Sequence, residues 1–167
     1  MIISSVVAIC ISLIMATSAI FVDKLTFTLP LLIKNWGTAF LVISLTGMAF
    51  PLTDWSFALG RKMGLRPETL PHVLVENFVA TLFFNTTATI VLTAVNVFHN
   101  PEIEAAVAAG FLPNTLTAFV QGVLHDWPIM FIISYVFAFF VTKAAIRIAK
   151  QAVGELKSPH SPQNQFQ

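Results

Sequence analysis

Long apolar runs alternate with short polar segments along this chain, and the pattern predicts membrane helices. The longest candidate covers residues 114–150, where a Pro-Asn start leads into an uncharged run at residues 127–142. A continuous helix over this segment would be about 55 Å long at 1.5 Å per residue, more than the roughly 30 Å of hydrocarbon in a bilayer. Its ends must therefore stand in the headgroups or beyond, and we expect it to span a membrane.

Three further candidate spans precede this segment, at residues 2–22, 30–62 and 69–98. The first contains no charge and is long enough to cross a bilayer. A cleaved signal peptide is the competing interpretation, but no Lys or Arg precedes the apolar run. The second opens at Pro30 and closes where Gly60 and Gly64 flank basic residues. The pattern therefore predicts four spans.

Two segments are predicted to lie outside the spans. Glu102 and Glu104, near a helix start in an Ala-rich segment, predict a short helix on the membrane surface. Residues 153–167 are rich in Pro, Ser, Gln and Asn and cannot bury enough apolar surface to fold alone. We expect this tail to be disordered and cytoplasmic.

Composition agrees with an integral membrane protein and excludes other classes. The chain is 56% hydrophobic and 10% charged, with a mean hydropathy of +0.81, which leaves too little polar surface for a water-soluble globule. The net charge of +1 argues against a nucleic-acid partner. Cys10 is the single cysteine, so neither an intramolecular disulfide nor a cysteine-based metal cluster can form within one chain.

The distribution of basic residues predicts the orientation. Lys24 and Lys34 fall on one side of the predicted spans. The other side holds the termini, the middle loop and the remaining basic residues: Arg61, Lys62, Arg66, Lys143, Arg147, Lys150 and Lys157. By the positive-inside rule, both termini are expected in the cytoplasm, with the protein in a bacterial cytoplasmic membrane.

An internal repeat relates the two halves of the chain. A constant offset pairs small residues of the first helix with polar residues of the third: Ser4 with Asn77, Ala8 with Thr81, Ser12 with Asn85, Ala16 with Thr89 and Asp23 with Asn96. A second offset lays Asn35–Trp36 on Asp126–Trp127. We therefore expect an all-α bundle of two tandem helical hairpins, residues 1–66 and 67–152, repeated in parallel about an axis along the membrane normal.

A family resemblance follows from these motifs. Residues 124–150 resemble the second half of the small bacterial membrane family catalogued as domain of unknown function 2798. The matching features are Asn96, Pro128 to Met130, Phe137 to Phe140, Lys143 and Arg147. The first copy is looser: Asp23, Gly37 and Pro51 stand where Asn96, Pro128 and Phe140 lie in the second. The resemblance covers nearly the whole chain as two copies and implies architecture, but no activity.

Ionisable groups in or near the spans are candidate functional residues, because burying one in a bilayer costs at least about 2.5 kcal/mol. His72 and Glu76 lie four apart on one helix face, which predicts either a proton-coupling pair or an interfacial pair near the helix N-terminus. Two such groups are too few to hold a metal, so we expect no metal site. Asp54 and Lys143 fall at matching repeat positions, which predicts a structural ion pair; solute or proton binding by Asp54 is the alternative.

Two further groups carry open alternatives. His125 and Asp126 precede Trp127–Pro128 near the predicted outer boundary, where they form either an interfacial anchor or an outer gate. Asn85 belongs to a polar stripe on the third helix, with Asn77, Thr81, Thr89 and Asn96. This stripe either makes interhelical hydrogen bonds, packing against the small residues Ala8, Ser12 and Ala16, or lines a hydrated path.

No enzyme motif is present: we find no HExxH, nucleophile elbow, phosphate loop or paired carboxylates, and we expect neither catalysis nor a cofactor. The first functional hypothesis is a small transporter or efflux-like protein, oligomeric because four short spans enclose little volume. Its carboxylates would contact a cationic or amphipathic solute. The alternative is a non-transporting membrane protein that binds or stabilises a partner protein.

Overall fold

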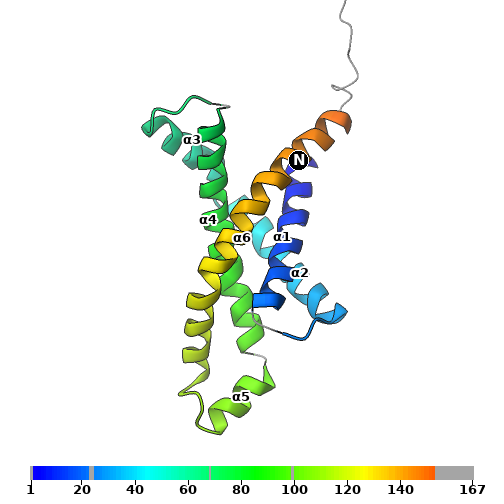
Figure 1. The fold of residues 1–167 in the computed structure, drawn as a ribbon, viewed down its shortest axis with the longest axis vertical. Coiled ribbons are helices and arrows are strands. Elements are labelled where there is room, and N and C mark those ends of the chain that lie inside the picture. The colour runs from blue at the N-terminus through cyan, green and yellow to red at the C-terminus, as the bar shows by residue number, and fades with distance from the viewer. Residues whose placement is uncertain (1, 23–24, 68, 99, 153–167) are drawn as a thin grey trace, which may run out of the picture.

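The computed structural model describes residues 2–22, 25–67, 69–98 and 100–152, and every regular element among them is a helix (Figure 1). The helices are α1 Ile2–Val22, α2 Leu29–Ala49, α3 Leu52–Lys62, α4 Leu70–Val97, α5 Pro101–Ala108 and α6 Thr115–Ala152. The predicted all-α class is confirmed for this part of the chain. The predicted disordered tail, residues 153–167, lies outside the described residues.

The four long helices form a ring in which successive helices run in opposite directions (Figure 1). Helices α1 and α4 each pack against both α2 and α6, and they meet each other at only a few positions. Helix α3 lies on α4 at one end of the ring, and α5 lies beside α6 at the other (Figure 1). The beginning of α1 and the C-terminal part of α6 lie together at the α3 end.

One hydrophobic core joins the two predicted segments. Its buried members come from all four long helices: Ile11, Met15 and Ala19 in α1, Ala39 and Ile43 in α2, Ala88 and Leu92 in α4, and Met130 and Ala138 in α6. The interior therefore continues across the predicted boundary at residue 66. The division of the sequence into two repeats stays a prediction.

The distribution of polarity is that of a protein in lipid. Large apolar side chains point outward, and Met48, Ile132 and Phe140 are 76%, 64% and 62% exposed. Polar side chains are buried instead, among them Asn85 and Asp126. Among the described residues, three helices are long and apolar enough to cross a bilayer: Leu29–Ala49, Leu70–Val97 and Thr115–Val141. Exposed apolar surface on this scale indicates contact with a lipid bilayer.

The starts of α5 and α6 agree with the sequence predictions. The Asn100 side-chain oxygen accepts a hydrogen bond from the Glu102 backbone N–H at 2.9 Å. The Asn114 oxygen accepts from the Thr117 N–H at 2.8 Å. Each asparagine thereby caps a helix N-terminus. The predicted short Ala-rich helix and the long helix beginning after a Pro-Asn pair are both confirmed.

The second predicted helix is wrong in one respect, because it does not continue from Pro30 to the basic residues. Helix α2 ends at Ala49, and Phe50 is extended, with φ −118° and ψ 133°. Pro51 has no N–H to donate to the helix, and its ring disfavours helical geometry in the preceding residue. The chain therefore turns at Phe50–Pro51 and starts α3, which packs against α4.

The end of α3 is the predicted glycine stop. Gly64 has a φ of +69°, a left-handed conformation that glycine adopts without steric cost. The Gly64 N–H donates to the Arg61 carbonyl at 3.0 Å, and the Leu65 N–H donates to the Gly60 carbonyl at 2.9 Å. These two bonds form a Schellman motif, which satisfies carbonyls that the last helical turn leaves free.

The packing of α3 on α4 yields a prediction at Gly60. A β-carbon at Gly60 would lie 2.7 Å from Cδ2 and 2.9 Å from Nε2 of the buried His72 ring. Gly60→Ala should therefore push α3 away from α4 and lower the free energy of unfolding by about 1–3 kcal/mol. Thermal unfolding in detergent measures the effect.

Gly37→Ala is the matched control, because nothing lies within 4 Å of a β-carbon added at this helical glycine. Alanine has the higher helix propensity, so this change should be neutral or stabilising by up to about 1 kcal/mol. Equal stability of the two variants would contradict the close packing at Gly60.

Candidate functional site

The polar stripe of α4 faces α6 and bonds to it. Asn77 donates through Nδ2 to the Tyr135 carbonyl at 3.0 Å, and Asn85 donates through Nδ2 to the Trp127 carbonyl at 3.1 Å. Asn85 is fully buried, and its Oδ1 accepts from the Ser134 hydroxyl at 3.4 Å. The predicted interhelical hydrogen bonding is confirmed at both asparagines.

The partner of this stripe differs from the one predicted. The small residues of α1 were expected to cover it, and Ser12 and Ala16 are indeed fully buried. However, α1 packs chiefly against α2 and α6, so α6 supplies the carbonyl partners of the stripe. Ser12 instead accepts a hydrogen bond from Nε1 of Trp36 at 3.1 Å.

The two repeated tryptophans make similar bonds inside the bundle. Trp36 in α2 donates to Ser12 in α1, and Trp127 in α6 donates through Nε1 to the Thr86 hydroxyl of α4 at 2.9 Å. Each indole N–H therefore donates to a hydroxyl on the preceding helix of its predicted hairpin. These bonds join the helices of each predicted hairpin, and the sequence analysis did not anticipate them.

Two cavities follow the stripe through the bundle. The larger is about 60 Å³, lies between α1, α4 and α6, and has polar lining residues Asn77, Thr81, Asn85 and Ser134. The smaller is about 10 Å³ and is lined by Ala19, Thr89, Leu92, Thr93, Asp126 and Met130. A cavity needs about 10–15 Å³ of water-accessible volume to hold one water molecule. The larger cavity can therefore hold several water molecules and the smaller cavity about one.

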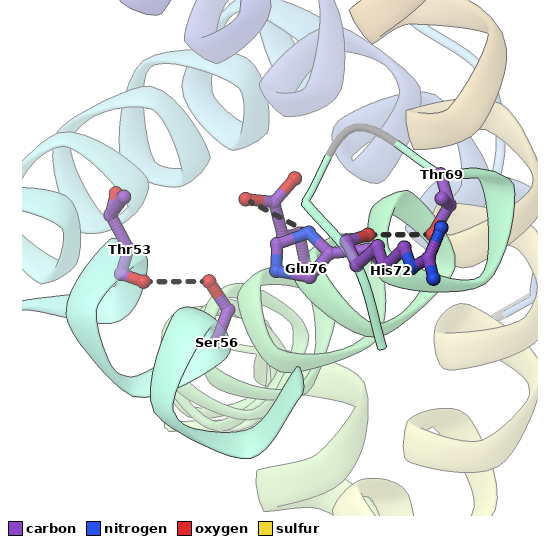
Figure 2. A network of polar contacts seen from close by, with 6 residues as sticks. Thr53, Ser56, Thr69, His72 and Glu76 are labelled. Atoms are coloured by element: carbon purple, nitrogen blue, oxygen red, sulfur yellow. Dashed lines mark hydrogen bonds and ion pairs between the residues drawn. The ribbon is translucent and has the colours of Figure 1, made fainter. Parts of the chain in front are cut away.

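His72 and Glu76 are brought together beneath α3, as predicted (Figure 2). Nδ1 of His72 lies 3.8 Å from Oε1 of Glu76. His72 is only 1% exposed and packs against the Phe57 ring with centroids 4.8 Å apart. Its Nε2 is buried without a hydrogen-bond partner. The Glu76 side chain is about one-third exposed, so this pair connects the interior to the end of the bundle.

The role of α3 at this pair escaped the sequence analysis. Phe57 and Gly60 were placed in the second span, whereas they lie on a separate helix that covers His72. Pro51 was the available signal, because it makes a continuous helix improbable at that point.

Asp126 is a buried carboxylate within α6. It is 7% exposed, and its Oδ1 lies 2.9 Å from Nδ1 of the exposed His125. Its Oδ2 accepts a long hydrogen bond, 3.5 Å, from the Thr93 hydroxyl of α4. Thr93 was not among the predicted residues, although a continued spacing of four from Asn77 through Thr89 leads to it. The His125–Asp126 pair therefore joins the exposed face of α6 to the polar stripe.

The predicted ion pair between Asp54 and Lys143 does not form among the residues that the structure describes. Asp54 lies exposed in the first turn of α3, because the chain turns at Pro51. The Lys143 ammonium instead lies 4.2 Å from the centroid of the Phe139 ring, a cation–π contact. Among the described residues, no hydrogen bond or ion pair joins Asp54 to either histidine–carboxylate pair.

The candidate residues form two sites joined by the stripe. From His72 to Thr93, α4 rises by about 30 Å at 1.5 Å per residue, so the two pairs lie near opposite ends of the bundle. Asn85 lies between them. In the described ranges, no three His, Cys, Asp or Glu side chains gather as a transition-metal site would require. The chemistry available is proton exchange and attraction of cations.

A contrast between two buried asparagines gives a testable prediction. Asn35 is fully buried, and neither amide atom has a hydrogen-bond partner, whereas Asn85 is bonded to α6. Asn35→Leu should therefore raise the free energy of unfolding by about 1 kcal/mol or more, because a buried unpaired amide is removed. Asn85→Leu should lower it by about 1 kcal/mol.

Denaturant or thermal unfolding of the two variants in the same detergent measures this difference. A loss of stability in Asn35→Leu comparable to that in Asn85→Leu would show that the Asn35 amide has a partner after all.

No family model matches the chain, and no curated protein or solved structure matches it. The resemblance to domain of unknown function 2798 therefore stays a prediction from its motifs, and the chain is an all-α protein with helices suited to a bilayer.

Proposed function

We propose that this protein is a small, proton-coupled transporter of a cationic solute in a bacterial cytoplasmic membrane. One observation carries the proposal: a stripe of polar side chains on α4 runs through the bundle interior and joins two histidine–carboxylate pairs at its ends. Buried groups of this kind in a membrane are costly and usually mark ion or substrate pathways.

Four membrane crossings belong to this proposal. Helix α1 has 21 residues, enough for a fourth crossing beside the three long apolar helices. The start of α1, the end of α6 and the basic helix α3 lie toward one end of the ring (Figure 1). Arg61, Lys62 and Arg66 are exposed there. This clustering supports cytoplasmic termini by the positive-inside rule.

The chemistry of the two ends supports proton coupling. His72 with Glu76, and His125 with Asp126, each combine an imidazole with a carboxylate, two groups that can exchange protons. The 60 Å³ cavity between them has room for water, and Asn77, Asn85 and Ser134 offer it hydrogen-bond partners. A proton taken up at one pair can then travel toward the other through water and the stripe.

The volumes limit what one copy can carry. Sites for drug-sized molecules occupy about 300–1,000 Å³, far above the two cavities of the bundle. A proton, a water molecule or a small cation fits inside one copy, whereas an amphipathic solute requires space between copies. The proposal therefore includes a homo-oligomer for any larger solute.

Neutralising the carboxylates tests the transport function. A drug-sensitive bacterial host is grown with cationic and amphipathic toxicants while it expresses the wild type, Glu76→Gln or Asp126→Asn at matched membrane levels. The wild type should protect, and each variant should lose most of that protection. Inverted vesicles with a pH-sensitive dye should show solute-driven proton release that falls by about tenfold or more in both variants, because a proton-transfer group is lost.

Asp54→Asn is the matched control, since this carboxylate is exposed and lies outside both pairs. It should protect as the wild type does. Wild-type protection by both Glu76→Gln and Asp126→Asn would refute proton-coupled transport and favour a protein that binds a partner without transporting.

A further inference from the structure

The smaller cavity places three oxygen-bearing side chains around a space of about one water molecule. It lies between α1, α4 and α6, has a volume of about 10 Å³, and includes Thr89, Thr93 and Asp126 among its lining residues. All three side chains are buried, with exposed fractions of 2%, 5% and 7%. The rest of the lining is apolar, so any charge placed there must be balanced locally.

The oxygens at this cavity have unused bonding capacity. Asp126 Oδ1 meets His125 Nδ1 and Oδ2 meets the Thr93 hydroxyl, but each carboxylate oxygen has two lone pairs. The Thr89 hydroxyl is buried without any hydrogen-bond partner in the protein. Such a group is costly in an apolar interior unless something in the cavity satisfies it.

We propose that this cavity binds an alkali-metal cation between the Asp126 carboxylate and the Thr89 and Thr93 hydroxyls. Carboxylate and hydroxyl oxygens are hard ligands, which suit hard cations. The single carboxylate neutralises a monovalent ion, whereas a divalent ion would leave a net positive charge in the interior. Because the cavity admits only about one water-sized body, an organic cation is excluded.

The ion site rests on the proposed function, in which Asp126 is a charge-bearing group of the transport path, and it identifies a cation that this group would hold.

Thermal stability in detergent tests the binding directly and needs no transport. The melting temperature of the full chain is measured in choline chloride, then in LiCl, NaCl and KCl at equal ionic strength and pH. An ion that binds the folded state alone raises the melting temperature with its concentration. The wild type should be stabilised by at least one metal ion relative to choline, and Asp126→Asn should lose this shift.

Thr89→Val separates ion binding from a structural role. Because the Thr89 hydroxyl has no partner, its removal should leave the melting temperature in choline unchanged or raised. The same variant should bind the metal ion about tenfold more weakly, which corresponds to losing one ligand. Thr89→Ser, which keeps the hydroxyl, should retain binding. Thr38→Val is the control, because this hydroxyl on α2 bonds the Lys34 carbonyl within its own helix.

Either of two results overturns the ion site. Equal melting temperatures in choline and in all three metal salts would mean that the cavity holds water only. An undiminished metal-ion shift in Thr89→Val would place the ion elsewhere. If the wild type shows no shift of melting temperature in any metal salt but its transport still depends on Asp126, the ion site is refuted and the proposed function is not. Ion binding without transport in vesicles supports the ion site and refutes the proposed function.

Discussion

The hydrogen bond from the Asn85 amide to the Trp127 carbonyl is the contact on which the arrangement of the interior depends. It lies at the centre of the bundle on a fully buried side chain, one residue before Pro128. Lipid offers no partner for an amide, so the bond sets the register of α4 against α6. A shift of one residue would turn the stripe away from α6 and leave its amides unpaired. In the observed register, Ser134 meets Asn85, and Thr93 meets Asp126.

Two prolines show that the packing around a proline determines whether a helix continues past it or ends there. Pro128 remains inside α6, where α1 and α4 pack against the same helix. Pro51 follows α2 directly, and there the chain leaves the helix and turns onto α4 as α3. Both prolines lack the donor N–H, but packing against neighbouring helices keeps α6 helical on both sides of the missing hydrogen bond at Pro128. The result at Pro51 is a separate amphipathic helix that covers His72 and closes one end of the stripe.

Long uncharged runs made most of the helices predictable from sequence, because length and the absence of charge indicate a long helix without knowledge of its neighbours. Residues 2–22, 69–98 and 114–150 became α1, α4 and α6 for this reason. The repeated spacing of polar residues also predicted interhelical hydrogen bonding as one of two alternatives, but with α1 as the partner, whereas Asn77 and Asn85 bond to α6. The close packing of Gly60 in α3 against the His72 ring could not be predicted, since it depends on the direction that the chain takes after Pro51. The Asp54–Lys143 prediction was wrong for the same reason: the turn at Pro51 puts Asp54 on a separate helix, α3, so matching repeat positions did not bring the two side chains together.

The ring closes only through α6, and this has a consequence for how the chain is made. Helix α4 is synthesised before α6, yet the Asn77 and Asn85 amides find their carbonyl acceptors in α6. During that interval the nascent chain carries amides with no acceptor from its last helix. A chain that ends before Thr115 therefore lacks the acceptors that both amides have in the full bundle, and lipid cannot replace them.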